Sequence, residues 1–490
     1  MNETQLLRAS HLLTEASATL MEDGAIAWVD EQIIATGSYT ELRARFPDAA
    51  CHHFRNHLVM PGLINAHDHG RGLGTLQMGV PDAPLELWIS GLFALRALDP
   101  YLVALCDGLT LLAAGVTTTT HQHNPCDWRN LEQELIDTAR GYRDAGIRAC
   151  IGVPLMDQNA LSYLGAEPFL ACLPTALAAE LRNAGFADPI SSSQGMIDVG
   201  KTLRAAWKNN SWHWLCWGPV GPQWCSDGLL EKIAEEAGDA PVHIHTVETS
   251  TQKAYGERIY GETPIAHLQT LGFLNSNVTC AHCVWLSDQD IVALQRSNAK
   301  VAHNPSSNLR LRSGIAPILR LRDAGITVGL GLDGQTLNDD QDMWLEMRLA
   351  RGLAVEPGVA GRALTASNVF SMATSAGAEI TGGPLRGLLA PGHAADMIAI
   401  SLNRISSPYL DSRTGLIEAV FGRAKPADVE AVFVGGRLSV EAFRSTNIDR
   451  SLVEEKLAEF LAQSKNAGQV AKESLVAQLL PHYRRIYSEY

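Results

Sequence analysis

The sequence lacks the patterns that direct a chain into a membrane, to a secretory route or onto a nucleic acid. No run reaches about 18 uninterrupted apolar residues, so no membrane span is expected. The first residues also lack the basic-then-apolar order of a signal peptide. Acidic side chains outnumber basic ones by 53 to 39, and the net charge of −14 argues against nucleic acid as the main partner. We therefore expect a cytoplasmic protein that acts on a small molecule.

Cysteine and glycine motifs are also missing where several cofactor sites would need them. The nine cysteines are scattered, and the single C-x-x-C, from Cys280 to Cys283, has no second copy to complete a structural zinc knuckle. Reduced thiols are the expectation. No Gly-x-Gly-x-x-Gly opens a helix after an early strand, so a dinucleotide site is not expected. The His-x-Glu and Pro-Cys-x-x-Cys pieces of one class of zinc deaminases are absent as well.

The middle of the chain alternates apolar strand-like segments with helix-like segments. Eight such alternations within 490 residues predict an α/β fold with a parallel sheet, whose most economical closure is a (β/α)8 barrel of the TIM type. A doubly wound open sheet is the alternative. The expected helices include 131–145, 227–237, 288–297 and 315–324, and the expected strands are 58–66, 117–121, 149–153, 215–218, 242–246, 278–282, 300–302 and 327–332.

Short β-type runs appear at both ends of the chain. Segments 24–29 and 32–37 are separated by Asp30 and Glu31, which predicts a hairpin, and similar runs return at 395–400 and 429–436. We therefore predict a small β-sandwich domain formed by residues 1–58 and 386–445, flanking a barrel over residues 59–385. Apolar residues at helical spacing predict a helical extension over residues 446–490.

Residues able to bind a metal follow most of the expected strands. The first strand ends in His67-Asp68-His69, and because side chains alternate along a strand, the two imidazoles point to the same side. The carboxyl ends of barrel strands share one face, where catalytic groups gather. The other residues of this kind are His121, His123, His243, His245, Glu248, His282, His303 and Asp333.

These segments together resemble the amidohydrolase superfamily. The similar branch contains the deaminases of purines, pterins, triazines and adenosyl-thioether nucleosides, and the chlorohydrolases. The resemblance covers most of the chain and implies a (β/α)8 barrel with a β-sandwich built from both termini. The matching segments, in chain order, are Pro61-Gly62-Leu63-Ile64-Asn65-Ala66-His67-x-His69, Gly115-Val116-Thr117-Thr118-Thr119, Gly221-Pro222-Gln223-Trp224-Cys225-Ser226, His245-x-x-Glu248, Ala281-His282-Cys283, His303-Asn304-Pro305-x-Ser307-Asn308, Leu332-Asp333-Gly334 and Pro391-Gly392 followed by Ala395-Asp396.

The resemblance assigns one divalent metal ion to His67, His69, His245 and Asp333. The ion is usually zinc, with Fe²⁺ as the alternative. Neutral imidazoles and one carboxylate leave an open position for a water molecule, and the metal lowers the pKa of that water towards 7. No lysine follows the fourth expected strand where a carbamylated bridge would need one, which favours one metal over two.

The same resemblance implies roles for further side chains. Glu248 serves as a proton shuttle, His282 orients the water or polarises the attacked carbon, and Asp333 can act as a base. Five residues are predicted to contact the substrate, and Arg71 among them could bind an anionic group. These residues are Arg71, Trp88, His123, Gln223 and Asn304.

The sequence thus predicts a metal-dependent hydrolase. In the favoured reaction, a metal-bound hydroxide attacks an amino-substituted N-heterocycle, because Glu248 can protonate the ring nitrogen. Hydrolysis of an amide, urea, carbamate or chloro-triazine bond is the alternative, and a non-catalytic binding protein is a remote one. Gly72 and Val220 replace a glutamine and a histidine of similar purine deaminases, which indicates another ring or leaving group. By resemblance, a homo-oligomer is expected.

Overall fold

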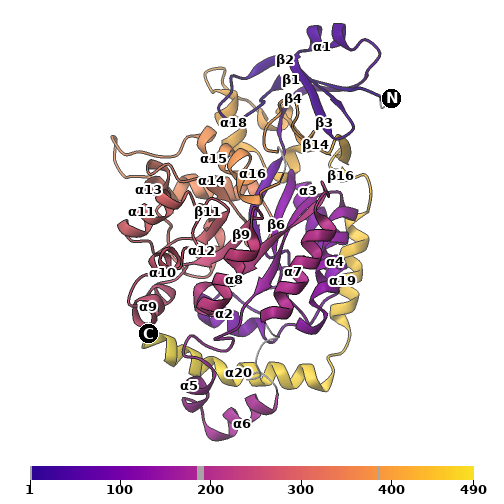
Figure 1. The fold of residues 1–490 in the computed structure, drawn as a ribbon. Helices are drawn as coiled ribbons and strands as arrows, with labels where there is room; N and C mark the ends of the chain where they lie inside the picture. Colours follow the sequence, from indigo (N-terminus) through magenta and orange to yellow (C-terminus); the bar gives the residue numbers. More distant parts are fainter. Residues whose placement is uncertain (1–2, 185–192, 384–385) are drawn as a thin grey trace.

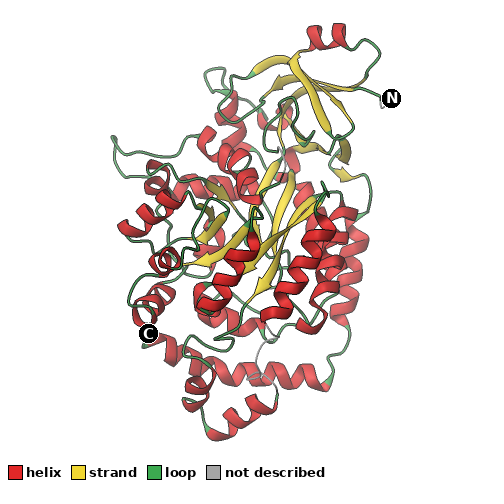
Figure 2. Ribbon diagram, in the orientation of Figure 1, coloured by secondary structure: helices red, strands yellow, loops and turns green. Residues whose placement is uncertain are grey.

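The computed structural model describes residues 3–184, 193–383 and 386–490. These residues form two eight-stranded sheets. Figure 1 shows the sheet built from both termini at one end, the barrel in the middle and helix α20 at the opposite end. Helices surround the barrel strands (Figure 2). The predicted fold class, a (β/α)8 barrel with a small β domain from both termini, is confirmed.

The barrel strands are parallel, and each pairs with the next one in the chain. Beyond the last strand, the Asp333 amide donates to the His67 carbonyl over 3.0 Å, which brings the two ends of the sheet together. The strands are β5 (Leu63–Asp68), β6 (Val116–Gln122), β7 (Arg148–Leu155), β8 (His213–Pro219), β9 (Val242–Thr246), β10 (Val278–His282), β11 (Lys300–His303) and β12 (Val328–Leu330).

Helix ends follow local sequence signals. Ser226 and Ser287 cap α8 and α11 through their side chains, and Gly146 ends α4 in the left-handed conformation, as expected for these residue types. The barrel helices are α2 (Leu85–Leu92), α3 (Pro100–Ala113), α4 (Leu131–Ala145), α5 (Ala166–Ala171), α6 (Thr175–Asn183), α7 (Ser193–Trp207), α8 (Asp227–Ala237), α9 (Ser250–Ile259), α10 (Pro264–Thr270), α11 (Asp288–Ser297), α12 (Pro305–Arg310), α13 (Ile318–Asp323), α14 (Met343–Leu353), α15 (Ala366–Met372) and α16 (Ser375–Thr381).

The terminal sheet is a single mixed sheet that curls back on itself. The edge strand that contains Gln32 pairs with the residues just before β13 through a bridge between Gln32 and Ala394. The core enclosed in this way includes Leu7, Trp28 and Phe433. The predicted hairpin is confirmed as β2 and β3. The strands are β1 (Gln5–Leu12), β2 (Met21–Val29), β3 (Gln32–Ser38), β4 (Ala50–Pro61), β13 (Met397–Ser401), β14 (Val429–Val434), β15 (Arg437–Glu441) and β16 (Arg444–Ser445), with α1 (Tyr39–Arg45), α17 (Leu402–Ile405) and α18 (Leu416–Arg423) beside them.

The expected single strand over residues 58–66 is wrong, because it is two strands in different sheets. Strand β4 ends at Pro61 in the terminal sheet, and β5 begins at Leu63 in the barrel. Gly62 lies at the crossing, where a Cβ atom would lie 2.2 Å from Thr117 Oγ1. The strand that carries His67 is therefore anchored directly to the terminal sheet.

A buried ion-pair cluster joins the two sheets. Arg148, at the start of β7, lies 3.0 Å from an Asp396 carboxylate oxygen and 3.2 Å from Glu31. The Gly435 amide also donates to Asp396. Arg148 is 1% exposed, so its charge depends on these partners.

Two C-terminal helices lie along the barrel. Helix α19 (Arg450–Ala462) packs against α3, and α20 (Ala467–Ser488) packs against α2. Leu475, Leu479 and Tyr483 of α20 share a small core with Phe169 of α5. Helix α20 thus crosses the barrel end that lies opposite the terminal sheet (Figure 1).

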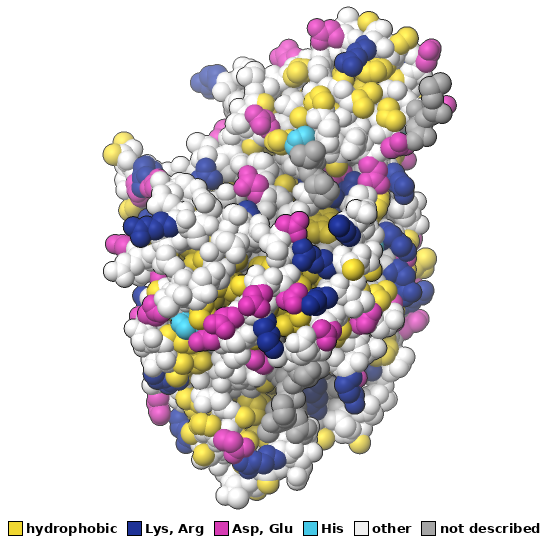
Figure 3. Space-filling view, in the orientation of Figure 1, with side chains coloured by type: hydrophobic (Ala, Val, Ile, Leu, Met, Phe, Trp, Pro, Cys, Tyr) yellow, Lys and Arg dark blue, Asp and Glu magenta, His cyan; other side chains and the backbone are white. Residues whose placement is uncertain are grey.

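Acidic and basic side chains are interspersed over the face drawn in Figure 3. Among the described residues, no helix combines the length and the hydropathy that crossing a membrane requires. All nine cysteines are free.

Candidate active site

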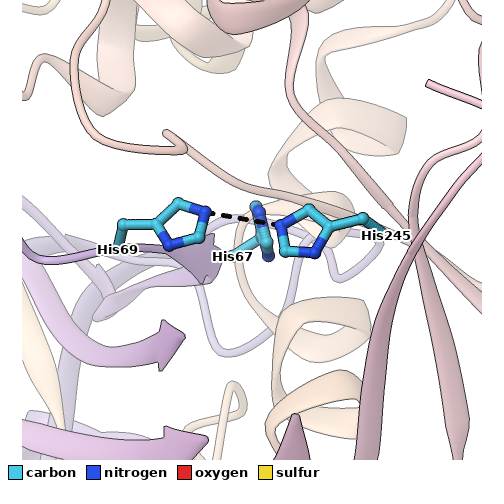
Figure 4. Close-up of side chains that lie close together, drawn as sticks. All are labelled: His67, His69 and His245. Carbon is cyan, nitrogen blue, oxygen red and sulfur yellow. Dashed lines mark hydrogen bonds between the residues drawn. The ribbon is translucent and has the colours of Figure 1, made fainter. Parts of the chain in front are cut away.

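Three histidines from two strand ends converge at the carboxyl end of the barrel. His67 belongs to β5, His69 follows that strand, and His245 lies in β9. His69 Nε2 and His245 Nε2 are 3.3 Å apart, and the three ring centroids form a triangle with sides of 4.9–5.4 Å. Figure 4 shows the three side chains gathered in this way. One ligand atom from each side chain falls within 4.8 Å of the others.

Asp333 completes this cluster from the loop after β12. Its Oδ1 lies 3.2 Å from His67 Nε2 and 3.3 Å from His69 Nε2. Ser307 Oγ donates to the other oxygen, Oδ2, over 2.5 Å. The carboxylate is therefore held with one oxygen facing His67 and His69 and the other bound by Ser307.

Backbone carbonyls set the tautomers of two of the histidines. Nδ1 of His69 lies 2.9 Å from the Gln122 carbonyl, and Nδ1 of His245 lies 2.7 Å from the Val220 carbonyl. A carbonyl only accepts, so Nδ1 carries the proton and Nε2 presents a lone pair. His67 Nε2 is buried without a hydrogen-bond partner, as a ligand nitrogen would be.

Burial controls the charges in the cluster. Desolvation lowers the pKa of His67, holds the pKa of His69 well below its ordinary value and brings the pKa of His245 to about 3. Burial alone would raise the pKa of Asp333, but its contact with His67 and the nearby rings of His282 and His69 hold that pKa well below its ordinary value. Three neutral imidazoles and one carboxylate match the donor set of a catalytic zinc site.

Glu248 and His282 lie beside the cluster. Burial raises the pKa of Glu248 to about 7, and Ser313 Oγ donates to its Oε1 over 3.3 Å. His282 Nδ1 is 3.8 Å from that oxygen, and His282 Nε2 is 3.8 Å from Asp333 Oδ2. His282 therefore spans the two carboxyl groups, and Asn308 Oδ1 holds its Nδ1 at 2.9 Å.

Two of the predicted substrate contacts lie at the mouth of the site. The Arg71 guanidinium lies 5.1 Å above the Trp88 ring. These two side chains and Asp333 line a small pocket of about 30 Å³. Trp88 Nε1 donates to Thr75 Oγ1 over 3.2 Å, which fixes the indole edge.

The other three predicted contacts are buried. Asn304 Nδ2 lies 3.4 Å from His282 Nδ1, and the Gln223 side-chain nitrogen has no partner among the described residues. His123 is different, because both ring nitrogens are engaged by the protein, at 3.2 Å from His121 and 3.0 Å from Glu134. The structure thus places His123 in an internal hydrogen-bond chain.

Sequence reasoning missed Glu86 in α2. Thr249, the residue after Glu248, donates to Glu86 Oε1 over 2.6 Å, and the charge of Glu86 contributes to the raised pKa of Glu248. Glu86 is 8% exposed. Helix α2 lies between two barrel strands and has no sequence motif that would mark Glu86. The only signal in the sequence was that this carboxylate comes two residues before Trp88.

Comparisons with known proteins find one matching family and relatives that align with most of the chain. Residues 58–439 match the Amidohydrolase family. The chain is 30% identical over 455 residues to the 5-methylthioadenosine/S-adenosylhomocysteine deaminase of Nitratidesulfovibrio vulgaris, covering 91% of this chain and 94% of that protein. It is 32% identical over 389 residues to the 5'-deoxyadenosine deaminase of Methanothermobacter thermautotrophicus, covering 78% and 81%.

A solved structure agrees with these sequence relatives. The crystal structure of an adenosine deaminase from Xanthomonas campestris, determined with bound zinc, superposes with a TM-score of 0.77 at 25% identity. The match covers 93% of this chain and 97% of that one.

Proposed function

This chain belongs to the amidohydrolase family, and we propose that it is a zinc-dependent deaminase of adenine-type nucleosides modified at the 5′ position. The observation that carries the proposal is the convergence of three neutral histidines and one carboxylate beside a glutamate whose pKa is near 7. The relatives named for 5-methylthioadenosine and 5'-deoxyadenosine supply the substrate class. They favour a purine ring over the different ring that Gly72 and Val220 indicated.

In this proposal His67, His69, His245 and Asp333 hold the zinc ion. Their facing nitrogens and oxygen lie 3.2–3.3 Å apart, and the fixed Nδ1 protons of His69 and His245 leave Nε2 free to bind. A bound zinc ion lowers the pKa of a coordinated water, which supplies a nucleophile near neutral pH.

Glu248 moves the protons in this mechanism. A carboxyl group with a pKa of about 7 can both accept and donate a proton at physiological pH. Its Oε1 takes one proton of the attacking water and delivers it to the ring nitrogen beside the amino-bearing carbon as the new C–O bond forms. The second proton of the same water then passes through Glu248 to the amino group, the C–N bond breaks, and ammonia leaves as the carbonyl forms.

His282 orients the attack. Asn308 Oδ1 accepts from Nδ1, so Nε2 bears the lone pair and points towards Asp333 Oδ2 at 3.8 Å. A lone pair at this position accepts a hydrogen bond from the attacking water. Trp88 and Arg71 close the mouth above it and keep solvent away from the transfer.

Ammonia release from zinc-loaded protein tests the proposal. We expect release from 5′-deoxyadenosine and 5′-methylthioadenosine, and little from guanine, a pterin or an aminotriazine. Glu248→Gln should lower kcat by about 10²–10⁴-fold while zinc content stays the same. Release of chloride or of an alkylamine from a triazine, without ammonia from any nucleoside, would instead support the alternative bond cleavages.

A further inference from the structure

Five buried side chains beside the candidate active site form a continuous hydrogen-bonded network that takes no direct part in the proposed reaction. Tyr142 Oη lies 2.8 Å from Asp107 Oδ2 and 3.0 Å from His121 Nδ1. His123 Nδ1 lies 3.2 Å from His121 Nε2, and His123 Nε2 lies 3.0 Å from Glu134 Oε2. None of these residues is more than 7% exposed, so they depend on one another for hydrogen bonds. We call them the five-residue network.

The network has one more contact than its ordinary hydrogens can fill. Its four contacts need four hydrogens. A neutral histidine has one ring hydrogen and a tyrosine has one hydroxyl hydrogen, whereas an ionised carboxylate only accepts. His121, His123 and Tyr142 therefore supply three. Two lone pairs would face each other at one contact unless the network holds a further proton.

Glu134 fixes the direction of the hydrogen bonds. Its two oxygens also accept from two successive backbone amides, over 2.9 and 2.8 Å. Burial alone would raise the pKa of Glu134, but the hydrogen bonds from His123 and these amides hold it below its ordinary value. The ionised carboxylate takes the Nε2 hydrogen of His123. His123 Nδ1 therefore accepts from His121 Nε2, and His121 Nδ1 accepts from the Tyr142 hydroxyl.

The further proton lies at the opposite end of the network. Tyr142 gives its hydrogen to His121, so its oxygen must accept from Asp107. Burial raises the pKa of Asp107 to about 6, and donation to Tyr142 stabilises the protonated carboxyl further. The alternative, a charged His121, is opposed by burial, His123 and Arg71, which hold the pKa of His121 well below its ordinary value.

The surroundings of Asp107 agree with a neutral carboxyl group. Gln341 Nε2 donates to Oδ1, which leaves Oδ2 to carry the proton towards Tyr142. The charged groups that face Asp107 from neighbouring segments are Arg71 and Asp68. A single guanidinium thus faces two buried carboxyl groups and cannot offset two negative charges.

The network also holds the 70–74 loop, which follows His69. The Gly72 amide donates to the Asp107 carboxyl. Gly70 passes directly over the middle of the network, because a Cβ atom there would collide with Tyr142 Oη and with a histidine ring of the network. Arg71 lies between these two glycines, so the position of its backbone is set by the network on both sides.

We infer that the five-residue network carries one shared proton, that this proton lies on Asp107, and that Asp107 and Tyr142 are positioning residues for the reaction. In this form every contact has its hydrogen, and the 70–74 loop is held against α3 and α4. Arg71 is thereby kept beside Trp88 at the mouth of the site. The kinetic part of this inference rests on the proposed function, whereas the location of the proton does not.

Infrared spectroscopy locates the proton. Aspartate labelled with ¹³C at the side-chain carboxyl separates the aspartic acid bands from those of Glu248 and Glu346. We expect zinc-loaded wild-type protein at pH 7 to show a protonated-carboxyl band that shifts in D2O and is missing from Asp107→Asn. A difference spectrum that contains only carboxylate bands for Asp107 at pH 7 would overturn the inference.

Matched variants test the positioning role. Tyr142→Phe removes two contacts from the middle of the network and should raise KM for 5′-deoxyadenosine by about 5- to 20-fold, with bound zinc unchanged. Asp107→Asn should retain most of the wild-type kcat/KM, because its amide donates to Tyr142 as the protonated carboxyl does. Tyr101→Phe removes a hydroxyl that is bound to Asp144 outside the network. It is the matched control and should change neither value.

The two measurements separate this inference from the proposed function. An unchanged KM in folded Tyr142→Phe would overturn the positioning role, and so would a KM that rises equally in Asp107→Asn. No ammonia from any nucleoside would refute the proposed function. The infrared comparison, which needs only the wild type and Asp107→Asn, would still decide whether Asp107 holds the proton.

Discussion

Buried Glu346 should make the stability of the protein fall as the pH rises, and one substitution should abolish that dependence. This carboxyl group of α14 is fully buried, and it accepts from the Ser306 amide over 2.8 Å and from the Ser306 hydroxyl. Burial raises its pKa from 4.5 to about 8. Ser306 precedes Ser307, which holds Asp333, so this contact supports the candidate metal site from behind.

The raised pKa of Glu346 determines whether stability rises or falls with pH. The folded protein keeps Glu346 protonated up to about pH 8, whereas the unfolded chain ionises near 4.5. The favourable contribution of Glu346 is therefore complete below pH 4.5 and is lost as the pH rises to about 8. The pKa difference of about 3.5 corresponds to roughly 4–5 kcal/mol at most.

Glu346→Gln should remove this loss, because an amide cannot ionise and still accepts from the Ser306 amide. We expect similar urea midpoints for the two proteins at pH 5 and a higher midpoint for the variant at pH 8. The difference in unfolding free energy should grow by about 1.4 kcal/mol per pH unit at most. Parallel stability curves from pH 5 to 8, or a variant that is less stable throughout, would refute the reasoning.

Two further substitutions test the junction between the sheets. Asp396→Asn leaves the buried Arg148 charge without its main partner, so urea unfolding should show that the unfolding free energy falls by about 3 kcal/mol. As a control, Asp23→Asn in the exposed pair with Arg8 should lower it by less than about 1 kcal/mol. Equal losses would contradict the burial argument. Gly62→Ala places a Cβ 2.2 Å from Thr117 Oγ1 and should destabilise by about 1–3 kcal/mol. Adding Thr117→Ala should restore part of that loss, and no recovery would show that the clash is elsewhere.

Regular local patterns made much of the fold predictable from sequence. Helices α4, α8 and α11 and strands β9 and β10 have the expected bounds, because their apolar spacing and caps are local signals. The continuous apolar run across Gly62 concealed a change of sheet. What separates β4 from β5 is pairing with β13 and with β6, far away in the chain.

The candidate site likewise contains residues that the sequence predicts and contacts that it does not. Metal-capable residues at strand ends could be predicted, because parallel strands bring their carboxyl ends together. Contacts between loops could not be predicted in this way. The ring of His123 is engaged by Glu134 on α4, Glu86 reaches Thr249, and α20 closes a cavity against α2. Each depends on how segments pack, which no local pattern records.

The most direct test of the central claim is a zinc titration of metal-free protein, with ammonia release from 5′-deoxyadenosine measured at each step. The proposal predicts that activity rises with bound zinc and saturates at one ion per chain, and that His245→Gln neither binds zinc tightly nor releases ammonia. Full ammonia release from metal-free protein, or none from protein that holds one zinc ion, would contradict the claim.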